Sequence, residues 1–169
     1  SLAFVKTKGH PMLGSEALKL FLKAGNVHVP NTSTLDLKMS PIEIISTEYK
    51  YTAIALKNYL SSFIQEGETI VIEKHSHLNK SEFIPKHYII RLKTKKEKRI
   101  IITVYKSLAC YSYKVIDGFN VLATDSALSL MYAYLFTNRA YYNKDKIKCA
   151  INILLNLQNK YLYSNKNIW

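Results

Sequence analysis

Apolar residues recur at intervals of three and four positions in four stretches of the chain, which is the period of an amphipathic helix. Gly14 and Ser15 precede the first stretch and Gly25 follows it, while Ser46 or Thr47 can cap the second. The last two stretches follow each other closely and should pack as a pair. The predicted helices cover about residues 16–23, 46–65, 124–136 and 144–161.

Other stretches have the patterns of strands. Apolar and polar residues alternate over residues 35–39, which predicts a half-buried strand that Pro41 ends. Three more stretches are rich in β-branched and aromatic residues and should pair with one another, namely residues 69–72, 87–92 and 99–105. Helices and strands in this order predict an α/β or α+β fold, in which helices flank a mixed sheet.

Length and composition limit the class of protein. The chain has 169 residues, of which 48% are hydrophobic and 21% charged, so we expect residues 1–169 to form a single domain, either a whole protein or one domain of a longer one. Its longest apolar stretches are too short to cross a bilayer, so we expect no membrane partner. Two cysteines, Cys110 and Cys149, provide no disulfide framework and no zinc spacing.

The charge changes this picture. Twenty-four Lys and Arg residues against twelve Asp and Glu give a net charge of +12, which favours a polyanionic partner. The densest group lies between the last two predicted strands, at the expected tip of a hairpin. These candidate RNA-binding residues are Lys93, Lys95, Lys96, Lys98 and Arg99. The alternative is a solvated tip without a partner.

The Gly14-Ser15 pair at the head of a helix, followed by a strand with Asp36, resembles the nucleotidyltransferases of the polymerase β superfamily. In that family a Gly-Gly or Gly-Ser pair opens a helix whose N–H groups hold a triphosphate. A strand follows with two carboxylates two residues apart, and a neighbouring strand supplies a third, so that magnesium ions are held.

Residues 103–113, 123–130 and 138–142 are similar to the poly(A) polymerases of large cytoplasmic DNA viruses, and the resemblance extends over about residues 13–161. It implies a nucleotidyltransferase-like fold with a C-terminal helix pair and a role in mRNA 3′-polyadenylation. The partners it implies are RNA and a catalytic nucleotidyltransferase domain or subunit, in a homo- or hetero-oligomer. The implied location is the host cytoplasm, in a viral factory, or the virion.

The departures from the family pattern are informative. Asp36 takes the second metal position, but Thr34 stands at the first, and the predicted strand over residues 99–104 contains no carboxylate. One carboxylate cannot hold two Mg²⁺ ions on a triphosphate. We therefore expect a degenerate domain, a pseudoenzyme, with no metal site, no cofactor and only a vestigial nucleotide-binding pair in Gly14 and Ser15. That pair has the alternative interpretation of a simple cap and turn.

Two other functions remain open. The chain is an active polynucleotide adenylyltransferase using ATP and Mg²⁺ if Asp36 is catalytic and a displaced carboxylate from Glu16, Glu43 or Glu73 completes the site. Alternatively it is a basic structural or assembly protein without RNA specificity.

Aromatic and histidine residues have simpler interpretations. Thirteen tyrosines are expected to fill the core with their rings more often than to stack on unpaired bases. His75 and His77 would face the same way on a strand, but no cysteine or carboxylate cluster supports a metal pair.

Overall fold

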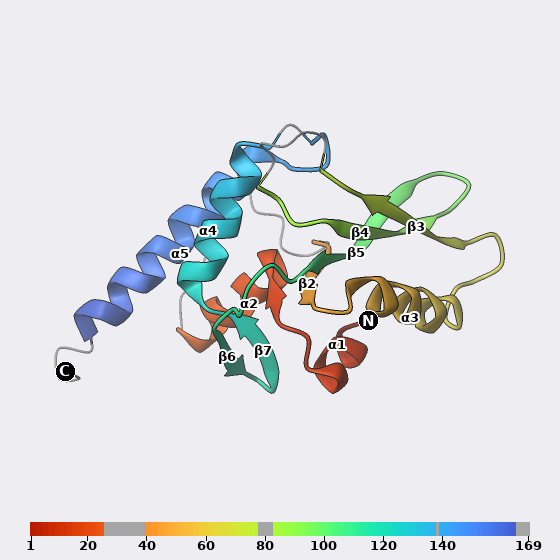
Figure 1. Ribbon diagram of the computed structural model, residues 1–169. Helices are drawn as coiled ribbons and strands as arrows, with labels where there is room; N and C mark the ends of the chain where they lie inside the picture. The colour runs from red at the N-terminus through yellow and green to blue at the C-terminus, as the bar shows by residue number, and fades with distance from the viewer. Residues whose placement is uncertain (26–39, 78–82, 138, 165–169) are drawn as a thin grey trace.

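The computed structural model describes residues 1–25, 40–77, 83–137 and 139–164. In these residues a seven-stranded mixed sheet is combined with five helices (Figure 1), which confirms the predicted α+β class. The helices are α1 (Leu2–Lys8), α2 (Gly14–Ala24), α3 (Tyr49–Ser61), α4 (Thr124–Leu135) and α5 (Lys144–Ser164). The strands are β1 (Met12–Leu13), β2 (Ile42–Ser46), β3 (Thr69–His75), β4 (His87–Lys93), β5 (Lys98–Lys106), β6 (Tyr113–Ile116) and β7 (Phe119–Leu122).

The sheet has the order β3-β4-β5-β2-β1-β7-β6. Strands β2 and β5 run parallel, as do β1 and β7, and the other neighbours are antiparallel. The predicted pairing of β3, β4 and β5 is confirmed, and the segment between β4 and β5 is a tight turn. In that turn the N–H of Thr94 donates to the carbonyl of Glu97 at 2.9 Å, and this hydrogen bond closes the lysine-rich tip.

The register of the central strands gives the sheet two distinct faces. Glu43 lies opposite Thr103, Ile45 opposite Tyr105, and Tyr105 opposite His87, so these five side chains share one face, here called the Glu43 face. Residues between them point the other way, where α3 packs against the strands and the hydroxyls of Ser46 and Thr52 lie 2.8 Å apart.

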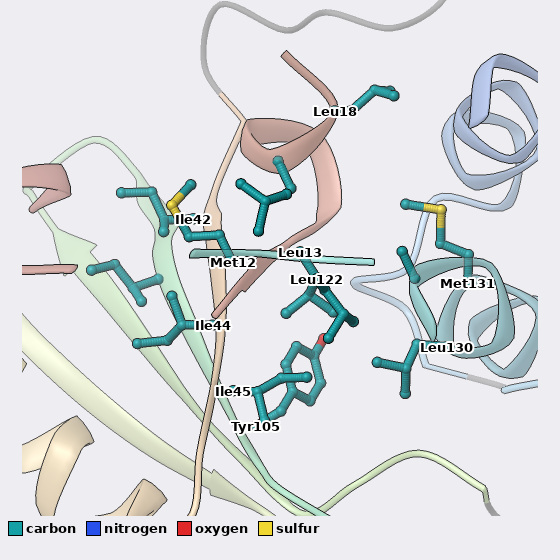
Figure 2. Packing of buried hydrophobic residues seen from close by; sticks show 14 of the residues in the cluster. Met12, Leu13, Leu18, Ile42, Ile44, Ile45, Tyr105, Leu122, Leu130 and Met131 are labelled. Atoms are coloured by element: carbon teal, nitrogen blue, oxygen red, sulfur yellow. The ribbon is translucent and has the colours of Figure 1, made fainter. Parts of the chain in front are cut away.

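The main core lies where the short strand β1 meets β2, β7 and the helices around them (Figure 2). Met12, Leu13, Ile44 and Leu122 are almost completely buried there, and Leu18 of α2 and Met131 of α4 belong to the same cluster. Helices α4 and α5 pack side by side, as predicted (Figure 1). Core burial on both sides of the sheet therefore fixes the positions of β1, β2 and the start of α2.

Several predicted boundaries were wrong. The chain over residues 42–46 forms strand β2, and helix α3 begins only at Tyr49 with Glu48 at its N-cap, so neither Ser46 nor Thr47 caps it. Strand β2 is central and mostly apolar, which removes the alternation that identifies half-buried strands. Helix α1 and strands β1, β6 and β7 were not predicted. The predicted strand over 35–39 lies outside the described residues.

No helix among the described residues has the length and apolar character needed to cross a membrane.

Candidate functional site

The turn that leads from β1 into α2 is shaped by Gly14. Gly14 is the first residue of α2 and has φ +71°, a conformation that side chains with a Cβ rarely adopt. A Cβ at this position would lie 2.8 Å from Cδ of Glu43 and closer still to Oε2. Leu13 pairs with Glu43 across the two strands, which brings the carboxyl group onto the turn. The glycine is therefore required both for the turn and for the close approach of Glu43.

Glu43 is the acidic residue nearest to the predicted phosphate-binding turn among the described residues. Its side chain is half-buried, and burial raises the pKa of its carboxyl group to about 7. Its cross-strand neighbour on β5 is the buried Thr103, and the next residue on its own face of β2 is Ile45. Neither can supply a second carboxylate. Thr103 carries a neutral hydroxyl, which is a much weaker ligand for magnesium than a carboxylate.

The other two displaced carboxylates have different surroundings. Glu16 lies in the first turn of α2 and pairs with Lys19 at 2.5 Å. Glu73 lies on β3, which β4 and β5 separate from β2, a distance of about 14 Å at the usual strand spacing. Asp36 and Thr34 lie outside the described residues. The described residues contain no group of three His, Cys, Asp or Glu side chains that could hold a metal ion.

Three tyrosines pack together near Glu43. The hydroxyls of Tyr105 and Tyr142 lie 2.8 Å apart, and the rings of Tyr134 and Tyr142 stack with their centres 4.7 Å apart. Tyr105 and Tyr134 are only 1% and 3% exposed, so here the prediction that tyrosines fill the core is confirmed. Burial, and then the charge of nearby Glu43, raises the pKa of Tyr134. Its hydroxyl oxygen makes no hydrogen bond of normal geometry among the described residues, although the nearby Tyr105 hydroxyl partly offsets the rise in pKa.

A second cluster of polar side chains extends from these tyrosines to the end of β3. The ring of His75 stacks on that of His87 at 5.2 Å. Nδ1 of His87 lies 2.8 Å from the carbonyl of Pro85 and Nε2 lies 2.7 Å from the hydroxyl of Tyr141. Because a carbonyl can only accept, Nδ1 carries the proton and Tyr141 donates to Nε2 when the ring is neutral. These contacts attach the segment between α4 and α5 to the sheet. His77, the proposed companion of His75, lies beyond the end of β3 and is exposed.

The hairpin cations are brought together but are not equivalent. Glu73 accepts hydrogen bonds from Lys98 and, at 2.9 Å, from Arg91. The hydrogen bond from Lys98, followed by the contacts with Arg91, lowers the pKa of Glu73 to about 2. Nε of Arg99 lies 3.9 Å from Glu97. Lys93, Lys95 and Lys96 are exposed at the tip, whereas Lys98 is already paired. RNA binding by this group stays a prediction.

A groove of about 570 Å³ connects the beginning of α2 to the same hairpin. It is within the usual size range of ligand sites, about 300–1,000 Å³. Its lining residues come from the start of α1, the first turn of α2, the start of β2 and the hairpin, and they are Ser1, Leu2, Glu16, Ser40, Ile42, Glu97, Arg99, Ile100 and Ile101. Arg99 and Glu16 were separate candidates from the sequence, and the groove that joins them was not predicted.

Comparison of the fold with solved structures found two informative likenesses. Megavirus polyadenylate synthase has a TM-score of 0.69 with this chain at 22% sequence identity, over 98% of this chain and 34% of that chain. The JHP933 protein from Helicobacter pylori has a TM-score of 0.50 at 16% identity, over 91% of this chain and 62% of that chain.

The first likeness confirms the predicted poly(A) polymerase-like, nucleotidyltransferase-like fold. The chain spans about a third of the length of the Megavirus protein. No family model matches the sequence, and no curated protein matches it.

Proposed function

We propose that this chain is a nucleotidyltransferase-fold domain of a viral polyadenylation polymerase that binds RNA and a catalytic partner domain without transferring nucleotides itself. The observation that carries this proposal is that the neighbours of Glu43 on its face of the sheet, Thr103 and Ile45, are neutral. The carboxyl group of Glu43 packs against Gly14, at the turn where the family holds a triphosphate. A polyphosphate at this turn would meet Glu43 without the neighbouring carboxylates that two magnesium ions need.

The electrostatics of the turn support the same conclusion. An active site of this family needs several carboxylates that stay ionised and bind magnesium, but Glu43 has its pKa raised to about 7, which is the opposite tendency. Buried tyrosines also pack near Glu43 and occupy space that a hydrated, metal-bound triphosphate would need. The described residues therefore do not fit two magnesium ions.

A binding role uses features that the chain does possess. Its net charge of +12 favours RNA, whose phosphates dominate the affinity of most RNA-binding surfaces. The Megavirus protein is about three times as long as this chain, and a catalytic domain would lie in such additional chain or in a separate subunit. A second RNA contact next to a catalytic domain keeps the primer at high effective concentration and so raises processivity.

An active adenylyltransferase is the second candidate, and the proximity of Glu43 to Gly14 favours it because one carboxylate is retained at the turn. The deciding experiment measures incorporation of labelled ATP into an RNA primer by the purified chain with Mg²⁺ or Mn²⁺. Our proposal expects no incorporation. Incorporation that is abolished by Asp36→Ala or Glu43→Gln would overturn it.

RNA binding separates the proposal from a basic assembly protein. A labelled oligoribonucleotide should bind with an affinity that falls steeply as salt concentration rises, since bound phosphates release counterions. Absence of RNA binding at low salt, or binding that does not change with salt, would contradict the proposal and favour an assembly role.

A further inference from the structure

The groove beside the hairpin is lined by apolar residues, here called its floor, and by charged residues of the hairpin, here called its rim. Leu2, which is 39% exposed, and Ile42, Ile100 and Ile101 supply apolar surface. Arg99, Ile100 and Ile101 lie at the start of β5 and Glu97 lies just before it, so this side of the groove is about 13 Å long at the usual rise per residue. An extended ligand with flat apolar parts fits such a surface better than a compact ion does.

The rim carries groups of both signs. Arg99 and Glu97 are largely exposed, and their separation of 3.9 Å leaves the guanidinium group able to turn to another anion. Lys95 and Lys96 are exposed in the same hairpin. Cations therefore lie at the tip side of the groove, while the Glu97 carboxylate can accept a hydrogen bond from a ligand amino group.

We propose that this groove holds a short stretch of unpaired RNA, with its bases on the apolar floor and its phosphates on Arg99, Lys95 and Lys96. This inference rests on the proposed function, in which the chain holds RNA, and it specifies the form of RNA and its position. A double helix keeps its bases stacked inside and cannot place them on the floor, so paired RNA is excluded from the groove.

Glu97 gives the groove a base preference. Adenine and cytosine carry exocyclic amino groups that donate hydrogen bonds, whereas uracil presents carbonyl oxygens in the corresponding positions. A carboxylate accepts from the amino group and repels the carbonyl oxygens. Oligo(A) is therefore expected to bind several-fold more tightly than oligo(U) of the same length.

The first test compares RNA forms and the floor of the groove by fluorescence anisotropy. Single-stranded oligo(A) should bind at least several-fold more tightly than a duplex of the same length. Leu2→Ala should weaken oligo(A) binding several-fold, whereas Leu108→Ala, which truncates an exposed leucine outside the groove lining, should leave it unchanged. Thermal midpoints of both variants establish that each is folded. Equal affinity for duplex, or equal effects of the two variants, would overturn the inference.

The second test asks whether removing a negatively charged side chain strengthens or weakens RNA binding. Removing a carboxylate that contacts no base makes the net charge more positive and should strengthen binding of every sequence alike. This is the result expected for Glu66→Ala, an exposed control outside the groove lining. Glu97→Ala should instead weaken oligo(A) binding and strengthen oligo(U) binding, so that the preference disappears. If Glu97→Ala strengthens both alike, the groove does not hold the bases, although the proposed function survives. If the unaltered chain binds no RNA, the proposed function itself fails.

Discussion

At the scale of single residues, Glu43 links the turn before α2 to the stability of the fold. The residue packs against the turn that begins α2, and burial raises the pKa of its carboxyl group from 4.5 to about 7. A carboxyl group in such surroundings is favoured in its neutral form. The consequence is a dependence of folding on pH that an exposed glutamate would not produce.

The expected pH dependence has a definite sign. Between pH 4.5 and 7 the folded state keeps the proton on Glu43 that the unfolded state releases, so the free energy of unfolding falls as pH rises through this window. The loss amounts to about 3 kcal/mol. Glu43→Gln should remove this part of the pH dependence and raise stability at pH 8. Urea unfolding at pH 5 and pH 8 measures both effects.

The control for this prediction is Glu66→Gln, which changes an exposed glutamate in the same way. Glu43→Gln should change the pH dependence more than this control does, because Glu43 combines burial with a raised pKa. A Glu43→Gln protein that loses stability at pH 8 would show that the ionised carboxylate is stabilising, contrary to the expectation.

Gly14 provides a second prediction at this scale. Gly14→Ala places a methyl group both in a left-handed backbone conformation, at a cost of about 1–2 kcal/mol, and against the carboxyl group of Glu43. Gly67→Ala is the matched control, because Gly67 has φ +85° and no atom of the described residues lies within 4 Å of the position that its methyl group would take. Gly14→Ala should therefore destabilise the protein more than Gly67→Ala does, as measured by urea unfolding. In a Glu43→Ala background the additional cost should largely disappear. Equal costs at the two glycines would contradict the close contact.

At the scale of elements, the tyrosines decide how the helical pair α4 and α5 is joined to the sheet. Tyr105 on β5 and Tyr142, just before α5, share a hydrogen bond of 2.8 Å. The hydroxyl of Tyr134 on α4 is buried near that of Tyr105 but makes no hydrogen bond of normal geometry among the described residues. Tyr142→Phe leaves a buried hydroxyl unpaired and should cost about 1–2 kcal/mol of unfolding free energy. Tyr134→Phe removes an unsatisfied group and should be neutral or stabilising. Thermal unfolding of the two variants checks the difference, and a larger loss for Tyr134→Phe would show that its hydroxyl has a partner after all.

Elements with a strong local pattern were predictable from the sequence, and elements defined by their neighbours were not. Strands β3, β4 and β5 are long and rich in β-branched residues, and α2, α4 and α5 have clear apolar stripes. Strand β1 has two residues, which is too short for any period, and β2 is a mostly apolar central strand. Strands β6 and β7 do have a local signal in the sequence between them. Asp117 and Gly118 both have positive φ, as the Asp-Gly turn of a two-residue hairpin requires.

The candidate site was predictable in part for the same reason. Gly14 and Ser15 were identified because a glycine before a helix is a local signal, and Glu43 was named as one of three displaced carboxylates. The contact between Gly14 and Glu43 depends on the register of β1 against β2, which no local pattern contains. The pairing of Lys98 with Glu73 depends similarly on the order of β3, β4 and β5. Long-range pairing therefore determines which predicted residues meet.

At the scale of the whole molecule, the excess of positive charge should act on RNA as a sum of separate phosphate contacts. The hairpin offers Lys93, Lys95 and Lys96 as exposed cations, whereas Lys98 is engaged by Glu73. Replacing all four hairpin lysines by Ala should weaken binding of all RNA sequences by a similar factor, because phosphate contacts carry no base information.

The division of roles within the hairpin gives the sharper form of this prediction. Lys95→Ala with Lys96→Ala should reduce the slope of log affinity against log salt by about 0.7 for each phosphate that is no longer bound. Lys98→Ala should change that slope less and reduce stability instead, since it removes a hydrogen bond that holds Glu73 ionised.

The control is Lys144→Ala with Lys146→Ala, which changes two exposed lysines at the start of α5. It removes the same net charge as the first pair and controls for the overall electrostatic field. A salt titration of RNA affinity measures all three slopes. If the two double variants reduce the slope equally, RNA is held by the overall charge of the molecule and the hairpin has no special role. If only the Lys95 and Lys96 double variant reduces the slope, the tip of the hairpin is the place where phosphates bind.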